Sequence, residues 1–323
     1  MLLENNNAII YGGGGAIGGV VARTFAREGA RVFLAGRTRE SLDVVAKDIR
    51  SAGGSAEVDE LDALDEQAVD EHARAVASQV GSIDVSFNLI SRGDVQGIPL
   101  VEMTVEDFVR PITTGITTNF VTARAAARRM IEQGSGVILA LDSGSANGSP
   151  IMMGGTGPAD AATDTFIRNL AAEVGPHGVR VVGIWTAGVP ETLSREKLAS
   201  VNSNLEMNDA TYQGLLDSLD QMRMTRRSPR LAEVGPHGVR VVGIWTAGVP
   251  ETLSREKLAS VNSNLEMDDA AYQGLLDSLD QMRMTRRSPR LVEVAATAAF
   301  LASDGAGAIT GTFVNVTSGT FLS

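Results

Sequence analysis

A glycine-rich run directly after the first predicted strand is the clearest chemical signal in the sequence. Residues 11–18 read Tyr-Gly-Gly-Gly-Gly-Ala-Ile-Gly and open an amphipathic segment. Glycines in such a strand–turn–helix passage allow a tight turn and let backbone N–H groups approach a pyrophosphate at the helix N-terminus. We therefore predict a dinucleotide site, against the alternative of a flexible turn without a ligand. Its predicted cofactor-binding residues are Gly12, Gly14, Gly15, Ile17 and Gly18.

The end of the second predicted strand carries a charge that discriminates between two cofactors. A carboxylate at this point would bind the ribose hydroxyls of NAD, whereas an arginine suits the 2′-phosphate of NADP. The strand ends in Gly36-Arg37, and Arg39 follows. We therefore favour NADP(H) over NAD(H), although both arginines could simply be solvated residues at the start of a helix. Asp62 and Ala63, just after the third strand, are predicted to lie beside the adenine ring.

Composition excludes several other chemistries. The chain has no cysteine, so it has no disulfide, no thiolate nucleophile and no cysteine metal site. No pair of its three histidines has metal-ligand spacing. The net charge of −11 argues against nucleic-acid binding, because no basic stripe could neutralise phosphates. The N-terminus does not read as a secretion signal, and no apolar stretch approaches the ~20 residues of a membrane helix. We expect a cytoplasmic protein that binds a small-molecule substrate.

Short apolar runs alternate with amphipathic segments along the chain. This alternation predicts an α/β fold, a doubly wound, Rossmann-like parallel sheet with helices on both faces. We expect residues 1–323 to form a single domain. The predicted strands lie at 8–11, 31–35, 55–58, 83–88, 137–141, 179–185 and 311–316, and the predicted helices near 15–29, 38–52, 66–80, 103–132, 156–175 and 292–302.

A long tandem repeat interrupts this pattern. Residues 172–231 occur again as residues 232–291, and only Asn208/Asp268 and Thr211/Ala271 differ. Two near-identical copies do not make a solenoid, which needs roughly three or more divergent units. We interpret them as a duplication, within an ordinary domain, of one segment that carries a strand and the helical stretch after it.

Several passages together resemble the short-chain dehydrogenase/reductase family. The glycine run stands for the family's TGxxxGxG, with Tyr11 and Ala16 as departures, and residues 87–91 fall where the family has its NNAG turn, of which Asn88 is kept. Residues 166–180 match its helix-to-strand passage, and residues 300–311 match its C-terminal helix and last strand. The resemblance covers the whole chain once one repeat copy is set aside. It implies a cofactor-binding Asn88, a nicotinamide-dependent oxidoreductase, and a homo-oligomer (dimer or tetramer) built on the two long helices.

The same resemblance implies that the catalytic set is incomplete. The family reduces carbonyls with an Asn–Ser–Tyr–Lys set, in which the lysine lowers the pKa of the general acid tyrosine and holds the nicotinamide ribose. Counted onto this chain, the tyrosine position is Thr156, the lysine position is Asp160 and the asparagine position is near Gly115. Ser143, thirteen residues before Thr156, remains. Ser143, Thr156 and Asp160 are therefore the candidate catalytic residues.

These replacements change the chemistry that the site can perform. A threonine hydroxyl is far less acidic than a phenol with a pKa near ~10, so Thr156 cannot supply a proton as tyrosine would. Asp160 could favour the positive oxidised nicotinamide, but it cannot lower the pKa of a neighbouring acid. A proton could come from Asp142, Asp160 or Asp164 if burial raised the pKa of that group. Each of them is otherwise an ordinary carboxylate.

Three functions remain open at this point. We favour an NADP(H)-dependent oxidoreductase with a non-standard active site, which transfers a hydride to or from a small organic substrate while Ser143 hydrogen-bonds the substrate oxygen. The first alternative is a catalytically inactive cofactor-binding protein, a sensor or a structural partner. The second is a non-redox enzyme on the same fold, against which the intact glycine turn argues.

Only one repeat copy can supply the sixth strand. If strand 179–185 does so, the second copy is inserted before the last helix, at the carboxyl ends of the strands. If strand 239–245 does so, the first copy loops out at the far side of the sheet. We favour the first arrangement, because it keeps helix 156–175 continuous with its strand. The surplus strand would then extend the sheet or pair across a subunit interface.

Overall fold

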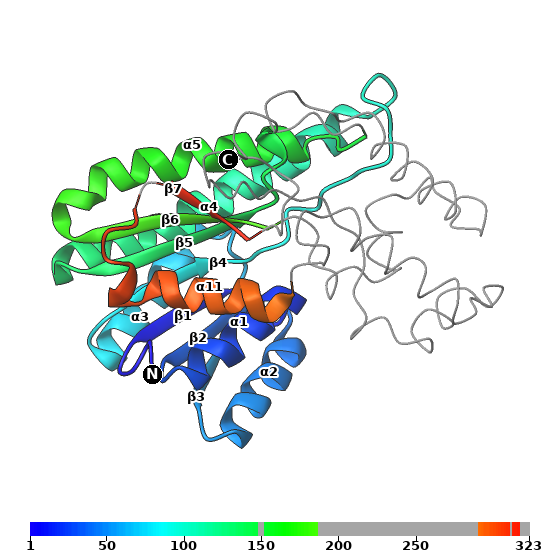
Figure 1. Ribbon diagram of the computed structural model, residues 1–323. Helices are drawn as coiled ribbons and strands as arrows, with labels where there is room; N and C mark the ends of the chain where they lie inside the picture. Colours follow the sequence, from blue (N-terminus) through cyan, green and yellow to red (C-terminus); the bar gives the residue numbers. More distant parts are fainter. Residues whose placement is uncertain (148–151, 187–289, 311, 317–323) are drawn as a thin grey trace, which may run out of the picture.

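The described part of the chain is built on one parallel sheet. The computed structural model describes residues 1–147, 152–186, 290–310 and 312–316. These residues form a seven-stranded sheet with the order β3-β2-β1-β4-β5-β6-β7, and every neighbouring pair is parallel. Helices cover both faces of the sheet (Figure 1). The chain winds outward from β1 to β3 and then from β4 to β7, so the predicted doubly wound, Rossmann-like fold class is confirmed.

The element bounds follow the sequence pattern closely. The strands are β1 (Asn7–Tyr11), β2 (Arg31–Gly36), β3 (Ser55–Glu60), β4 (Val85–Asn88), β5 (Gly136–Asp142), β6 (Val179–Trp185) and β7 (Thr312–Asn315). The α-helices are α1 (Ala16–Arg27), α2 (Arg39–Ser51), α3 (Glu66–Val80), α4 (Val105–Gln133), α5 (Thr156–Val174) and α11 (Leu291–Ala302), with 3₁₀ turns η1 (Ser145–Asn147), η2 (Gly175–His177) and η5 (Asp304–Ala306). Each predicted strand and helix among the described residues is confirmed, with ends that shift by a few residues.

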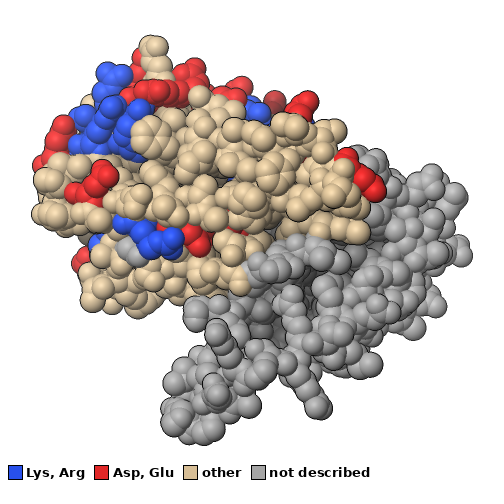
Figure 2. All heavy atoms as spheres, turned by 90° about the horizontal axis from the view of Figure 1, so that it is seen from above, with Lys and Arg blue, Asp and Glu red and all other residues tan. Residues whose placement is uncertain are grey.

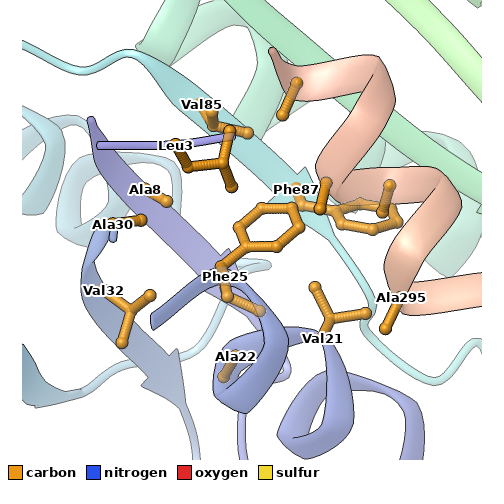
Figure 3. Close-up of a cluster of buried hydrophobic side chains, with 14 of the residues drawn as sticks. Leu3, Ala8, Val21, Ala22, Phe25, Ala30, Val32, Val85, Phe87 and Ala295 are labelled. Carbon is orange, nitrogen blue, oxygen red and sulfur yellow. The ribbon is translucent and has the colours of Figure 1, made fainter. Parts of the chain in front are cut away.

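Alternate residues of each strand enter two separate cores, because successive side chains of a strand point to opposite faces. On one face, Phe25 of α1 and Ala295 of α11 pack with strand residues such as Val32 and Phe87 (Figure 3). On the other face, the buried sides of α3, α4 and α5 cover strand residues such as Ile138. With both faces covered, the strands read as nearly continuous apolar runs, as the sequence indicated.

Two long helices, α4 and α5, cover the second face of the sheet, and α5 carries two of the candidate catalytic residues. Helix α4 begins at the N-cap Thr104, whose hydroxyl accepts a hydrogen bond from Asp107 N at 3.1 Å, and ends at Gly134. Helix α5 places Thr156, Asp160 and Asp164 at positions i, i+4 and i+8, so these three buried side chains follow one face of the helix. That face is turned toward the sheet and α4.

The first repeat copy supplies the sixth strand, as the favoured arrangement predicted. Strand β6 pairs with β5 on one side and β7 on the other. The alternative strand, 239–245, lies outside the described residues, as does most of both copies, so the single-domain prediction for residues 1–323 stays a prediction. The chain leaves β6 at Thr186, whose N–H donates to Asp142 O at 2.8 Å, and returns at Leu291, which packs beside Ile17 and Leu141. Thr186 and Leu291, which lie on either side of residues 187–289, are therefore both at the carboxyl edge of the sheet.

A search of the described residues finds no helix that is long and apolar enough to cross a membrane. The same part of the chain contains no cluster of histidine and acidic residues that could hold a metal ion.

Candidate functional site

The carboxyl edge of the sheet holds a cradle with the shape that a pyrophosphate requires. Strand order reverses between β1 and β4, and ligands of open α/β sheets bind in the crevice outside the strands at such a point. Here Gly12 has φ +78°, and a Cβ atom on it would lie 2.5 Å from Leu89 O. A Cβ atom on Gly18, in the first turn of α1, would lie 2.1 Å from Gly12 O. The turn thus keeps backbone exposed at the start of a helix, which fits the phosphates of a dinucleotide.

The remaining predicted residues of this turn surround the cradle. Gly14 lies against Ser41 of α2, and Gly15 is the N-cap of α1. Ile17 is half-buried and packs against the first core and against α11. These three residues therefore hold the turn between α1 and its neighbours.

Arg37 and the two residues after β3 occupy the outer half of the same edge. Arg37 is exposed at the end of β2 and has no ion pair with a described residue, whereas Arg39 pairs with Asp43 at 3.5 Å. Ala63 is buried, and Asp62 is exposed with its carboxylate accepting a hydrogen bond from Leu64 N at 3.0 Å. The arrangement leaves the Arg37 guanidinium free to meet an anion.

The side chain of Asn88 fixes the passage after β4. Its amide donates to Thr118 Oγ1 at 3.2 Å and to Asn119 Oδ1 at 3.0 Å, and its oxygen accepts from Ile90 N at 3.1 Å. Asn88 therefore ties the turn to α4, and it would reach a cofactor through the backbone that it positions.

All three candidate catalytic residues belong to one hydrogen-bonded chain, which we call the edge network. It comprises Arg92, Asp94, Gln96, Ser143, Ser145, Thr156 and Asp160. At one end, Gln96 Nε2 donates to Thr156 Oγ1 at 3.2 Å, and Thr156 Oγ1 donates to Asp94 Oδ1 at 2.9 Å. At the other end, Ser143 Oγ donates to Asp160 Oδ2 at 2.5 Å.

Arg92 joins the two ends of the edge network. Its Nη1 lies 2.7 Å from Asp160 Oδ1, and its Nη2 lies 3.1 Å from Asp94 Oδ1. Although burial lowers the pKa of Arg92, the charges of Asp160 and Asp94 raise it above the usual value, so the guanidinium stays charged. Asp160 also accepts a hydrogen bond from Ser145 N at 2.8 Å. This wholly buried carboxylate is therefore fully paired.

The carboxylates determine where the hydroxyl protons lie, because an ionised carboxylate can only accept. Thr156 gives its proton to Asp94, and Ser143 gives its proton to Asp160. In the 2.6 Å contact between Ser143 Oγ and Ser145 Oγ, the donor is therefore Ser145. Towards a ligand, Ser143 and Thr156 act as hydrogen-bond acceptors, so neither is arranged to protonate a substrate.

A second pair of acids lies beside the edge network, between β5, α5 and β6. Asp142 Oδ1 accepts from Gly144 N at 2.8 Å, while its buried Oδ2 accepts no hydrogen bond. Burial, together with the charges of Asp160 and Asp164, raises the pKa of Asp142 well above its usual value. Burial also raises the pKa of Asp164, against the hydrogen bond that Trp185 Nε1 donates to it at 3.0 Å. Burial therefore favours the protonated form of both carboxyl groups.

Tyr11 does not replace the tyrosine that the family uses. It is completely buried at the end of β1, with its ring 5.9 Å from that of His72. Burial, followed by the charge of Asp70, raises the pKa of Tyr11. A phenol that is harder to ionise and faces the core cannot serve as the acid. The other tyrosines, Tyr212 and Tyr272, lie outside the described residues.

Sequence reasoning missed Arg92, Asp94 and Gln96. They lie in the connection between β4 and α4, far in sequence from α5. Their signal was present but weak: three polar residues, alternating with Gly93 and Val95, begin four residues after the buried strand β4 ends. The structure also explains why a glycine occupies the position near which the family has its asparagine. A Cβ atom on Gly115 would lie 2.7 Å from Arg92 Cδ, so a larger residue would collide with the arginine.

The sheet order and the glycine turn define a Rossmann-like α/β protein, and comparisons with known proteins refine that class. The family model described as short chain dehydrogenase matches residues 6–202. L-rhamnose 1-dehydrogenase (NAD(P)(+)) of Azotobacter vinelandii is 28% identical over 227 residues, which cover 69% of this chain and 88% of that protein. The 7alpha-hydroxysteroid dehydrogenase of Escherichia coli is 30% identical over 199 residues, which cover 62% of this chain and 75% of that protein.

A solved structure agrees on the fold. That of NAD+-bound xylitol dehydrogenase has a TM-score of 0.69 at 20% identity, covering 99% of this chain and 100% of that one. The chain therefore belongs to the short-chain dehydrogenase family of oxidoreductases, and the resemblance inferred from its motifs is confirmed.

Proposed function

We propose that this protein is an NADP(H)-dependent oxidoreductase with a non-standard active site, which transfers a hydride between the cofactor and a small organic substrate. The supporting observation is that the glycine cradle, the unpaired Arg37 and the edge network share one edge of the sheet. When bound, the nicotinamide supplies or accepts the hydride. The residues of the chain then have to orient the substrate and move one proton. Gly12, Gly14, Gly15, Ile17 and Gly18 form the phosphate end of the proposed site, and Asp62, Ala63 and Asn88 line or support it.

In this proposal Asp142 is the general acid that donates a proton to the substrate. Ser143 and Thr156 are hydrogen-bond acceptors toward a ligand, and Asp160 is fully paired. Asp142 is the acid whose pKa is raised well above its usual value, and it adjoins Ser143 in the chain. A carboxylic acid whose pKa is raised by burial can donate a proton in place of the missing tyrosine.

Cofactor binding is the first test. We would titrate the purified protein with NADPH and with NADH in a calorimeter, and repeat both titrations with Arg37→Ala. Hydrogen bonds to charged groups contribute about 1.5–3 kcal/mol, so Arg37→Ala should weaken NADPH binding roughly 10-fold to 100-fold and leave NADH binding unchanged. Arg39→Ala is the matched control, because Arg39 is exposed on the same turn but already paired with Asp43. Equal affinity of the wild-type protein for NADPH and NADH would reject the NADP preference.

Turnover is the second test. The names of the relatives point to sugars and steroid alcohols as a first panel, assayed with NADP+ by absorbance of the reduced cofactor. With any substrate found, Asp142→Asn should abolish most turnover while leaving cofactor affinity unchanged. Full activity of Asp142→Asn would remove Asp142 from the mechanism.

One observation favours a second candidate, a cofactor-binding protein without turnover. The protons of both hydroxyls and the charge of Asp160 are all committed within the protein. A site whose polar groups are all hydrogen-bonded within the protein could bind the cofactor without transferring a proton to a substrate. Tight binding of NADPH together with inactivity over the whole panel would support this candidate.

The assembly and the compartment complete the proposal. Seen from the α5 side, the molecule shows a broad area with few charged side chains (Figure 2). Val105, Val109 and Phe120 of α4 are exposed, and the Phe120 ring lies 6.1 Å from that of Phe166 on α5. An apolar area of this kind on two long helices is typical of a protein–protein contact, which supports a homo-oligomer, a dimer or tetramer. The absence of cysteine suits the cytoplasm.

A further inference from the structure

Arg92 is the one basic member of the edge network, and the structure makes room for it. Its aliphatic stem crosses α4 at Gly115, where a Cβ atom would lie 2.7 Å from Arg92 Cδ. Any larger residue at position 115 would push the stem aside. The small residue on α4 and the long residue after β4 therefore belong together.

Asp160 occupies the position on α5 at which the family has its lysine. Asp160 is a short side chain on α5, and Arg92 Nη1 lies one hydrogen bond beyond it, at 2.7 Å. None of the three lysines of the sequence belongs to α5 or to the β4–α4 connection. The pair Arg92–Asp160 thus brings a permanent positive charge to a helix that carries none of its own there.

Arg92 keeps donors to spare. A guanidinium has five N–H groups. One of them, on Nη1, donates to Asp160, while Nε and one N–H of Nη2 donate to the two oxygens of Asp94. Two N–H groups have no acceptor among the described residues, and 14% of the side chain is exposed. The two aspartates hold the fork in place and leave part of it open.

Arg92 belongs to the β4–α4 connection, which borders the second half of the crevice. Leu89 O is in close contact with Gly12, so the chain between β4 and Arg92 borders the glycine cradle. A dinucleotide whose pyrophosphate sits on that cradle extends one nucleoside toward β2 and the other across β4 toward β5. Ser143 at the end of β5 and Arg92 after β4 are joined through Asp160 on this second side.

We propose that Arg92 is a cofactor-binding residue, which donates its two spare N–H groups to the ribose hydroxyl oxygens of the nicotinamide half and is positioned by Asp160 and Asp94. This inference rests on the proposed function, because it needs a dinucleotide on the cradle. It assigns Asp160 a positioning role rather than direct contact with the substrate.

The test uses the whole cofactor and one half of it. We would titrate NADPH and adenosine 2′,5′-bisphosphate, which lacks the nicotinamide half, into the wild-type protein and Arg92→Met. NADPH affinity should fall about 10-fold or more, and affinity for the bisphosphate should not change. Arg92→Lys should recover part of the NADPH affinity, because a point charge replaces the fork. Arg110→Met, on an exposed arginine of α4, is the control and should bind both probes as the wild type does.

A double variant separates contact from folding. Arg92→Met leaves the buried Asp160 unpaired and should lower Tm, whereas Arg92→Met/Asp160→Asn removes the stranded charge and should restore much of Tm but none of the NADPH affinity. Wild-type NADPH affinity in Arg92→Met or in the double variant would overturn the inference, as would an equal loss for both probes. If the wild-type protein bound neither NADPH nor NADH, the proposed function would fail with it, a result that no Arg92 variant could produce.

Discussion

At the scale of single residues, two hydroxyl groups donate their protons to carboxylates of the protein and therefore act only as acceptors towards a ligand. Ser143 donates to Asp160, and Thr156 donates to Asp94, so both oxygens present lone pairs to a ligand. A site built on a general-acid tyrosine presents a proton at the same place. With threonine in place of the phenol, the proposed acid is Asp142, whose pKa is raised by burial and by the neighbouring charges of Asp160 and Asp164.

Asp142 makes stability depend on pH in a direction that can be stated. Its pKa is raised in the folded protein, so between the unfolded value of ~3.9 and the folded value the native state binds more protons than the unfolded state. Stability contributed by this group is present at low pH and is lost as the pH rises through that window. Asp142→Asn removes the loss, so Tm of the variant minus Tm of the wild type should increase with pH above ~4.

Thermal unfolding followed by circular dichroism in steps of pH measures this difference. Asp164→Asn should show the same sign, because the pKa of Asp164 is also raised. A difference that does not change with pH would contradict the raised pKa of Asp142.

Restoring the residues that the family uses should damage this protein. In Thr156→Tyr/Asp160→Lys, the new ammonium group would lie beside the Arg92 guanidinium, which would lose its partner at 2.7 Å. Breaking a buried ion pair costs about 3–5 kcal/mol, so Tm should fall by roughly 10 °C. Adding Arg92→Ala should recover a large part of the loss. A double variant as stable as the wild type would show that the edge network contributes little to folding.

At the scale of elements, the glycine turn connects β1 to α1 and sets the distance between the helix N-terminus and β4. A side chain at Gly18 would meet Gly12 O, and one at Gly12 would meet Leu89 O. The cradle is therefore a product of close backbone contacts, which tolerate no added atoms.

Gly18→Ala tests the cradle directly. Its Cβ atom would lie 2.1 Å from Gly12 O, so the turn has to move. Overpacking of this kind costs about 1–3 kcal/mol, and NADPH affinity should fall at least about 10-fold because the N–H groups no longer converge. Gly175→Ala is the control, since a Cβ atom at Gly175 meets nothing within 4 Å. Unchanged NADPH affinity in a folded Gly18→Ala variant would remove the cradle from the proposed site.

At the scale of the whole molecule, the duplication is accommodated without disturbing the sheet. Strand β6 comes from the first copy and the first residue of α11 from the end of the second. The chain departs at Thr186 and returns at Leu291, both at the carboxyl edge. The added length therefore lies in the connection between β6 and α11, whose two flanking residues are both at the carboxyl edge of the sheet.

Deletion of residues 232–291 should leave a folded protein. The deletion joins Leu231 to Val292 and keeps β6 and the remainder of α11 in order. We expect a cooperative thermal transition and, for the cofactor, an affinity within about tenfold of that of the full chain. Circular dichroism and calorimetry provide the two measurements. Aggregation of the shortened protein would show that the second copy has become structurally required.

The uncharged area on α4 and α5 predicts how the protein assembles. Phe120→Glu places a charge on the exposed face of α4, beside Phe166. Burying a charge without a partner is strongly unfavourable, so the variant should dissociate at concentrations where the wild type is oligomeric, with unchanged secondary structure. Sedimentation velocity distinguishes the two. Identical sedimentation of the variant and the wild type would place the interface elsewhere.

The sequence by itself determined the architecture. Apolar runs flanked by amphipathic segments are a local signal, and a parallel sheet covered on both faces leaves few ways to arrange them. The glycine run, the arginine after β2 and the missing tyrosine and lysine were readable for the same reason, since each depends on its place at the end of one element. The element bounds moved by only a few residues between expectation and structure.

The tertiary structure alone decided how the altered site is held together. Arg92 and Asp160 are distant in sequence, and only the packing of the β4–α4 connection against α5 brings their charges within 2.7 Å. The raised pKa of Asp142 likewise arises from burial between β5, α5 and β6. Burial and charge pairing are properties of assembled layers, and no residue carries them alone. A local pattern can therefore show that a lysine is missing, but only the folded chain shows which side chain stands in its place.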